Sequence, residues 1–348
     1  MSGVLRSPWL RGGVVVAGLA AVVSLLWWRG PDWHTVGDAF TAVVWQWVAI
    51  AIGFNVLSVV ARSIAWTQVI DAAIPKPWPR FRSIFSAFSV GLMANAVLPG
   101  RIGELARVAV LSRKLPRRKG LWATLVGTVF AHRIFDLVPV VMLILYVVVT
   151  ARIPAWATTS LVAVVAVGVA LFAFAFASAK LPHRTRVEGL SAFRRVLTMA
   201  RQGLGVMRIG PRAGIAVLFQ SVGWFCQLLA VYTAMRAFHI HSPLPAAGLV
   251  LVLMNVATIF PLWPGNVGLV QAAIALPLTQ YGVAYARGVA YGFGLQAIEA
   301  SVGVGVGLIF LAREGLSFAM LRVMPGAEQA DQASHEEIDE PDRAGVPG

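Results

Sequence analysis

The sequence contains almost no cysteine, since Cys226 is the only one among 348 residues. A single cysteine excludes an intrachain disulfide framework and a cysteine-based metal site. The six histidines are scattered without metal-ligand spacing, and no P-loop signature is present. We therefore expect no metal or other cofactor, and no step driven by nucleotide hydrolysis.

Charged residues are also scarce. They make up 13% of the chain, against 58% hydrophobic residues, and the mean hydropathy is +0.75. Because soluble domains carry about 25% charged residues, this composition excludes a soluble catalytic domain of this size. Apolar stretches of about 20 residues, the length of a membrane-spanning helix, recur from Gly12 almost to Leu311. The composition predicts an all-α polytopic membrane protein.

Basic residues exceed acidic ones, but they do not form one basic face. The 29 lysines and arginines, which give a net charge of +14, occur in short blocks between apolar runs. This distribution follows the positive-inside rule, so we expect no nucleic-acid partner. Seven of the 15 acidic residues fall in residues 326–348, predicted to be an acidic, disordered cytoplasmic tail. We expect a multi-pass protein of the cell inner (plasma) membrane with both termini in the cytoplasm.

Six apolar runs are predicted to cross the bilayer, at residues 12–28, 43–61, 121–149, 156–177, 213–235 and 288–311. Two further apolar segments, 83–111 and 246–278, are each interrupted by a Pro-Gly pair. The first segment has basic residues on both flanks, so it must enter the membrane and return to the same side. We expect two re-entrant helical hairpins with tips near residues 99–100 and 264–265. The alternative is that both hairpins cross, which gives eight spans.

The two hairpin tips resemble each other. Residues 98–104 read LPGRIGE and residues 263–269 read WPGNVGL, so Pro-Gly and a second glycine recur at the same spacing. Residues 1–150 and 151–325 each read as two spans, a broken hairpin and a third span, but they start on opposite sides. This order predicts an inverted-topology repeat, whose helix breaks line a polar path near the bilayer midplane. The competing interpretation is that Pro-Gly pairs are ordinary loop residues.

Few charges interrupt the apolar body. A charge at the bilayer centre costs about 2.5 to 3.5 kcal/mol, so each one needs a partner. Residues three apart share a helix face, and this spacing joins Glu104 to Arg107 and Arg133 to Asp136. One interpretation is that these are structural ion pairs. The other is that arginines contact a lipid phosphate and acids balance them. The intramembrane charges considered are Arg101, Glu104, Arg107, Arg133, Asp136 and Glu299.

Other polar residues receive simpler interpretations. Arg62 and Arg287 are predicted to extend to the two membrane interfaces, with their stems along apolar surface. Cys226 is predicted to be a packing residue. His239 and His241 are expected in a solvated outer loop.

Three segments occur in order along the chain: residues 98–107 (LPGRIGELAR), 133–136 (RIFD) and 261–268 (PLWPGNVG). Together they resemble the flippase-like transmembrane family of lysylphosphatidylglycerol synthases. The resemblance implies movement of a lipid between leaflets, with aminoacyl transfer left to a separate soluble domain. Nothing after Leu311 is large enough to be that domain, so we expect a stand-alone translocator and no enzyme.

The repeat, the charges and the resemblance together give the candidate substrate path. Its residues are Pro99, Gly100, Arg101, Gly103, Glu104, Arg107, His132, Arg133, Asp136, Pro264, Gly265, Asn266, Gly268, Gln271, Gln296 and Glu299. The family often has glutamate where His132 and Gln271 stand, and arginine where Gln296 stands. Joint loss of the last two charges is expected of a buried pair, because removing one partner alone is costly. It also argues against a cationic lipid.

The leading functional hypothesis is a lipid flippase for a phospholipid, an aminoacylated lipid or a related lipid-linked headgroup. Its partner is a membrane lipid, and its energy source is a downhill gradient or coupling to protons or ions. The candidate proton carriers are Glu104, Asp136 and Glu299. The alternatives are an integral membrane enzyme that modifies a lipid headgroup and a non-transporting membrane assembly subunit.

Overall fold

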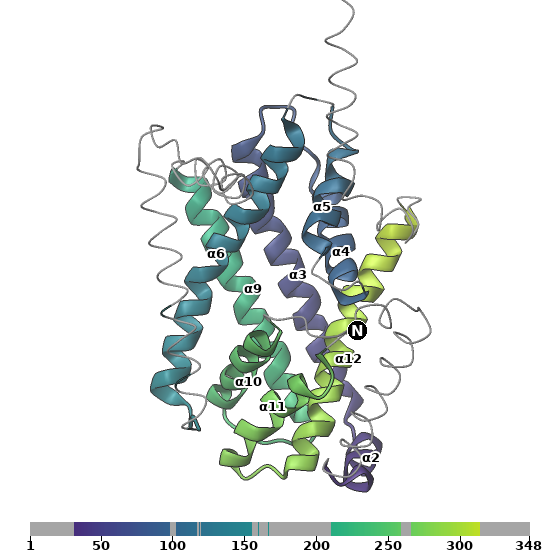
Figure 1. Cartoon of the computed structure of the whole chain (residues 1–348), viewed down its shortest axis with the longest axis vertical. Helices are drawn as coiled ribbons and strands as arrows, with labels where there is room; N and C mark the ends of the chain where they lie inside the picture. The colour runs from purple at the N-terminus through teal and green to yellow at the C-terminus, as the bar shows by residue number, and fades with distance from the viewer. Residues whose placement is uncertain are drawn as a thin grey trace, which may run out of the picture.

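The computed structural model describes residues 31–97, 102–116, 118, 120–154, 159, 166, 210–258 and 266–313. Every regular element in these residues is a helix (Figure 1), which confirms the all-α prediction. The predicted spans 12–28 and, apart from two residues, 156–177 lie outside the described residues. So do both hairpin tips, both chain termini and the acidic tail.

Among the described residues, four helices are long and apolar enough to cross a membrane: α3 (Trp45–Ala73), α6 (Leu121–Thr150), α9 (Gly210–Ala237) and α12 (Tyr285–Arg313). Each has 28 to 30 residues. At about 1.5 Å per residue such helices exceed the roughly 30 Å of bilayer hydrocarbon. The four corresponding predicted spans are confirmed. One boundary was wrong, because α3 continues well beyond residue 61.

Local sequence signals set several helix ends. A short helix, α2 (Trp33–Thr41), begins where the Asp32 side chain accepts a hydrogen bond from the His34 N–H at 3.0 Å. Helix α3 ends two residues before Pro75, a position where the chain leaves the helical conformation. Helix α6 follows Gly120, which takes a positive φ of 75° that glycine adopts without strain.

The first helical hairpin consists of α4 (Phe81–Val97) and α5 (Gly103–Ser112). Helix α3 ends and α6 begins at the upper end of the bundle in Figure 1, so this pair enters from that end and returns to it. The 17 and 10 residues of its helices are too few to cross the hydrocarbon layer. The hairpin is tight, since the Gly103 N–H donates to Asn95 Oδ1 at 2.9 Å. A side chain on Gly103 would also collide with the Gly91 carbonyl.

The second hairpin consists of α10 (Leu244–Ala257) and α11 (Leu269–Leu278), followed by the 3₁₀ turn η5 (Thr279–Tyr281). It lies between the end of α9 and the start of α12, both at the lower end in Figure 1. The two hairpins therefore enter the bundle from opposite ends, as an inverted-topology repeat predicts. The internal repeat and its boundary at residue 150 stay predictions.

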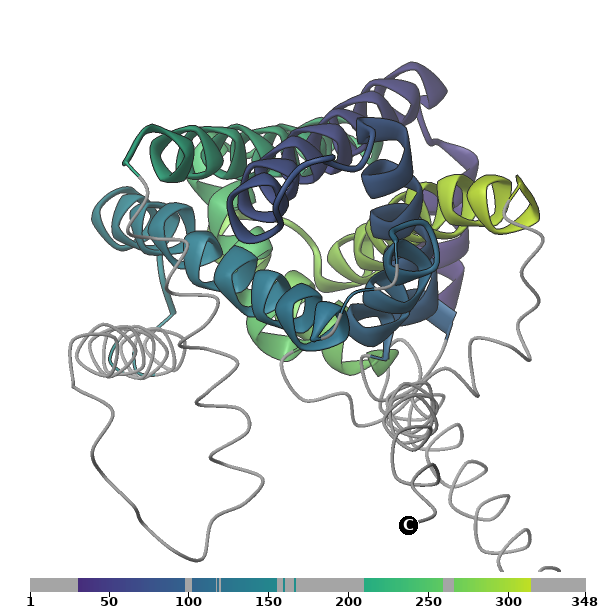
Figure 2. The ribbon, with the colours of Figure 1, turned by 90° about the horizontal axis from the view of Figure 1, so that it is seen from above.

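Two apolar cores fill the bundle, one around each hairpin. One core joins α3, α4, α5 and the first half of α6. The other joins α9, α10, α11 and the first half of α12. Helices α3 and α9 lie side by side across both (Figure 2), and the Ser58 hydroxyl donates to the Gly223 carbonyl at 2.7 Å between them. Each hairpin thus has its own apolar support.

Candidate functional site

Polar side chains collect where the two apolar cores meet. On α6 the upper core ends at Phe135 and the lower begins at Leu143, and Asp136 lies between them. On α12 the lower core ends at Ile298 and the upper begins at Val302. The polar residues at this boundary are Asp136 on α6, Glu299 on α12, and Gln220, Trp224 and Gln227 on α9. The boundary therefore forms a polar layer inside an apolar bundle.

A chain of ion pairs joins α5 to α6 at this layer. Glu104 pairs with Arg107 at 2.7 Å on its own helix and with Arg133 on α6. Arg133 Nη1 also donates to Asp136 Oδ2 at 3.2 Å. Both predicted pairs with a spacing of three are therefore present, and Arg133 links them into one network. Two guanidinium groups and two carboxylates balance each other in it.

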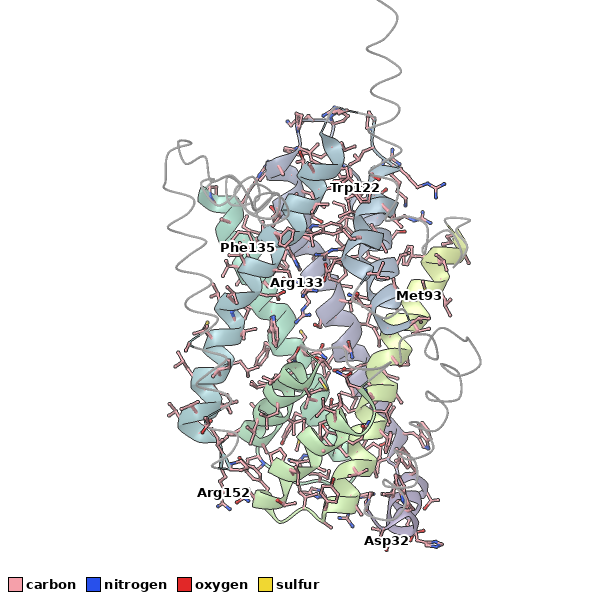
Figure 3. The ribbon with its side chains drawn as sticks, in the orientation of Figure 1. Asp32, Met93, Trp122, Arg133, Phe135 and Arg152 are labelled. Carbon is pink, nitrogen blue, oxygen red and sulfur yellow. The ribbon has the colours of Figure 1, made fainter. Side chains whose placement is uncertain are left out.

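The network is closed on one side and open on the other. Arg107 is 4% exposed, and its guanidinium lies 4.7 Å from the ring centre of Trp66 and 5.5 Å from that of Phe88. Such cation–π contacts offset part of the cost of burying the charge. Arg133, by contrast, has a side chain that is 52% exposed and lies midway along the bundle in Figure 3. A charged group is thus accessible at half the depth of the protein.

The carboxylate of Asp136 is held from a second helix. Its Oδ1 accepts from Trp224 Nε1 at 2.8 Å and from Gln220 Nε2, both on α9. The neighbouring His132 is buried, and its Nε2 lies 3.2 Å from the Arg62 carbonyl oxygen. Because that carbonyl only accepts, Nε2 carries the proton, and the buried Nδ1 has no partner within the described residues. A second N–H at the buried Nδ1 would have no acceptor among these residues, which favours the neutral imidazole for His132.

Arg62 does not extend to the membrane interface, and that prediction was wrong. Its stem packs against Gly223 of α9, and its guanidinium lies 4.8 Å from the ring centre of Trp224. Within the described part of the chain, Arg62 makes no salt bridge and its buried Nε–H has no hydrogen-bond partner. The reason for the error is that α3 continues to Ala73, which leaves Arg62 inside the bundle.

The second hairpin contributes neutral groups. Gln271 Nε2 donates to Gln296 Oε1 at 2.5 Å, so the two glutamines expected to replace a charged pair are in contact. Gln271 also accepts from the Gly268 N–H at 2.6 Å, and Asn266 donates to the Ala257 carbonyl at 2.9 Å. These bonds order the start of α11 and hold it against the end of α10. The path residues of this hairpin thus carry amides in place of ions.

Glu299 lies one turn beyond Gln296 on α12. Its Oε1 accepts from Gln227 Nε2 of α9 at 2.7 Å, and its charge lies close enough to Arg62 for the two to interact.

The described candidates thus form three groups: the ion network with His132, the Gln271–Gln296 pair with Asn266 and Gly268, and Glu299. Gly103 belongs to the closure of the first hairpin. The predicted residues Pro99, Gly100, Arg101, Pro264 and Gly265 lie outside the described residues.

Sequence reasoning missed the contribution of α9. Gln220, Trp224 and Gln227 follow each other at spacings of four and three in an apolar helix, so they share one face. This polar stripe was the signal in the sequence that could have identified them.

Cys226 is buried within the lower half of α9 as a packing residue, as predicted, and the exposed positions of His239 and His241 also agree with prediction. Both histidines line an open hollow of about 330 Å³ near η5.

Comparison with known proteins places the chain in a family. The family described as "Lysylphosphatidylglycerol synthase TM region" matches residues 14–307. The chain belongs to this family. A weaker similarity connects it to the UPF0104 membrane protein PH1989 of Pyrococcus horikoshii, at 26% identity over 129 residues. That match spans 37% of this chain and 37% of the relative, and no solved structure matches.

Membership confirms the resemblance found in the sequence. It indicates a lipid-related function in the membrane for this member of the lysylphosphatidylglycerol synthase TM family. Among the described residues, the polar layer between the two hairpins holds the paired ions and buried amides of the candidate site.

Proposed function

We propose that the protein moves a lipid headgroup between the leaflets of the inner membrane while the acyl chains stay in the bilayer. One observation carries this proposal: Arg133 is half exposed at mid-depth while it pairs with Glu104 and Asp136. A charge at the bilayer centre costs about 2.5 to 3.5 kcal/mol. An accessible and balanced charge there supports a passage for polar groups.

The chemistry of the network suits a phosphate group. A guanidinium binds phosphate through two parallel N–H donors, and the interaction is strengthened where water is excluded. Glu104 and Asp136 hold Arg133 from two sides, so its open edge is already oriented toward an incoming anion. The headgroup would add to this edge without displacing the buried Arg107.

The opposed hairpins support a mechanism of alternating access. The helices of each hairpin end within the bundle. The discontinuous helices of transporters that rock around a central site do the same. Basic residues cluster at the end where the first hairpin enters, among them Lys76, Arg80, Arg82, Arg113, Arg118 and Arg212. By the positive-inside rule we assign this end to the cytoplasm.

We also propose transport and not catalysis. A general acid or base needs a carboxylate that is free to exchange its proton with a substrate. The two carboxylates beside the exposed Arg133, Glu104 and Asp136, are instead both paired with arginine, and Glu299 lies apart from them on α12, hydrogen-bonded to Gln227. This pairing supports a binding role for the two acids.

Leaflet exchange in proteoliposomes tests the proposal. Fluorescent phosphatidylglycerol and aminoacylated phosphatidylglycerol are followed by dithionite quenching with native protein, Arg133→Ala and Asp136→Asn. We expect native exchange well above empty liposomes and loss of exchange in both variants. Arg236→Gln is the control, since Arg236 is likewise an arginine on a long apolar helix, but it contacts Tyr232 at the far end of α9 and has no part in the ion network. Native protein that gives no exchange above empty liposomes would overturn the proposal.

A further inference from the structure

Arg62 is a cation without a direct counter-ion in the polar layer. Its stem is fixed by Gly223 and its guanidinium by Trp224, yet none of its N–H groups donates to a described side chain. Asp136 is near, but its oxygens already accept from Arg133, Gln220 and Trp224. An arginine held in place with its donors unused is a preformed site for an anion.

Glu299 is the other charged side chain of the layer that has no ion-pair partner among the described residues. It accepts one hydrogen bond, from the neutral amide of Gln227, and makes no salt bridge with a described residue. Arg62 is the cation whose charge acts on it. Glu104 and Asp136, in contrast, each have an arginine within pairing distance. Of the three proton carriers proposed from the sequence, Glu299 is the one that can exchange a proton without breaking an ion pair.

Charge balance connects these two residues. The described layer holds the guanidinium groups of Arg62, Arg107 and Arg133 against the carboxylates of Glu104 and Asp136, while His132 is neutral. The remaining positive charge of Arg62 is balanced either by an ionised Glu299 or by an anionic ligand. If both were present, the layer would carry an excess negative charge in a region where unbalanced charge is costly.

From this balance we infer that Arg62 binds the phosphodiester of the transported lipid and that Glu299 takes up one proton when it does. The inference rests on the proposed function and deepens it, because it assigns an anionic phospholipid as substrate and a proton as its companion. Lipid and proton then enter the layer together, and the layer stays neutral in the empty and the loaded state.

The surroundings of Glu299 leave it without a competing ionic partner. Helix α3 contributes Arg62, and α9 contributes Gln227 beside the thiol of Cys226. On α12 itself, the Tyr291 hydroxyl acts as a donor to the Val231 carbonyl at 3.0 Å. Helix α11 has no ionisable residue, and in α4 the only one, Arg82, stands in the first turn. The ionisable residues of α2, at the far end of α12, are His34 and Asp38.

Calorimetry on the full chain in detergent micelles tests the inference. Dioctanoyl phosphatidylglycerol is titrated between pH 5 and pH 9 in pairs of buffers that differ in ionisation enthalpy, which reports the protons taken up per bound lipid. Because a carboxylate loses its proton as pH rises, native binding should weaken at high pH, by up to tenfold per pH unit, with uptake approaching one proton. Dioctanoyl glycerol, which lacks the phosphate, should not bind.

The variants separate the two residues. Glu299→Gln should abolish proton uptake and keep tight binding at high pH. Arg62→Gln should weaken binding about tenfold or more, and Arg62→Lys should restore part of it, because a point charge replaces the planar fork. Arg62→Lys also decides the matter if Arg62→Gln does not fold. The controls are Asp38→Asn and Arg236→Gln, which should behave as native protein.

Three results would overturn the inference. Proton uptake that persists in Glu299→Gln removes the role of Glu299, and native affinity in both Arg62 variants removes that of Arg62. Inorganic phosphate that binds as tightly as the lipid, with the same dependence on both residues, assigns the site to a free anion. Leaflet exchange on the same preparations keeps the proposals apart: exchange without proton-linked binding rejects only this inference, and proton-linked binding without exchange rejects only translocation.

Discussion

The two hairpins have the same shape and opposite chemistry. Each is closed across its tip by one asparagine, Asn95 in the first and Asn266 in the second. At the polar layer, however, α5 presents the ions Glu104 and Arg107, whereas α11 presents the amide of Gln271. Hairpin geometry therefore depends on small residues and short hydrogen bonds, and the charge is an independent addition.

This difference suggests a division of labour within the polar layer. The charged hairpin offers groups that hold an anion, while the neutral one offers hydrogen bonds that can exchange without separating ions. If both hairpins placed ions in the layer, the free-energy cost of removing charges from water would arise in both. The predictions below alter the charged hairpin, then the Arg62 position between the hairpins, and last the neutral hairpin, and they end on the variant expected to change the protein least.

Removing the central acid of the charged hairpin should have the largest effect. Glu104→Gln leaves Arg107 and Arg133 without their shared partner, and an unpaired buried charge costs about 3 to 5 kcal/mol. We expect a strong loss of thermal stability in detergent and no leaflet exchange. The double variant Glu104→Gln/Arg107→Met should recover part of the stability, because it removes the buried cation as well. Equal stability of the native and Glu104→Gln proteins would show that the network is not structural.

Adding a side chain between the two helices of the charged hairpin should reduce the stability less. A methyl group on Gly103 meets the Gly91 carbonyl and the Asn95 side chain, and such overpacking costs about 1 to 3 kcal/mol. Gly103→Ala should therefore lower the melting temperature while the ions remain. Gly305→Ala on α12 is the control, since nothing lies within 4 Å of the added atom, and it should be neutral or slightly stabilising. The same melting temperature for both variants would contradict the close approach of α4 and α5.

Displacing Arg62 should affect binding more than stability. In Gly223→Ala the added methyl group stands 2.7 Å from Arg62 Cγ, so the arginine side chain must shift from its native position. We expect a loss of about 1 kcal/mol of stability and weaker binding of dioctanoyl phosphatidylglycerol. Gly214→Ala, on the same helix with open space around the added atom, is the control. Unchanged lipid binding in Gly223→Ala would separate Arg62 from the headgroup.

Much of the fold could be predicted from the sequence because it follows from local properties. Apolar length predicted the long helices, and the basic flanks of residues 83–111 predicted that this segment returns to its own side. The end of α3 was missed because Arg62 resembles an interfacial residue, whereas Pro75 sets the true end. A charge that is buried by a distant helix cannot be told from an interfacial one by hydropathy alone.

The candidate site was predictable only within single helices. The spacing of three predicted the pairs Glu104–Arg107 and Arg133–Asp136, because such residues share a helix face. The link between Glu104 and Arg133 depends on how α5 packs on α6. The hydrogen bond from Trp224 to Asp136 likewise joins positions 88 residues apart. Such tertiary contacts leave no periodic signal in one sequence.

The neutral pair of the second hairpin allows the most specific test, because its double variant is expected to change the stability least. Gln271 and Gln296 are hydrogen-bonded where a glutamate and an arginine would form an ion pair. Gln271→Glu alone adds an unpaired carboxylate at a buried position and should destabilise the protein by about 3 to 5 kcal/mol. Adding Gln296→Arg should return the stability to within about 1 kcal/mol of native, because the new charges pair with each other.

A double-mutant cycle measures this coupling from the melting curves of the four proteins. Gln271→Glu combined with Arg287→Gln, an exposed position near the start of α12, is the control and should show no coupling. Additive effects of Gln271→Glu and Gln296→Arg would mean that the two side chains do not meet in the folded protein. If they are coupled, leaflet exchange by the double variant tells whether the second hairpin must be neutral. Exchange at the native rate would reject the division of labour between the hairpins, and reduced exchange at native stability would support it.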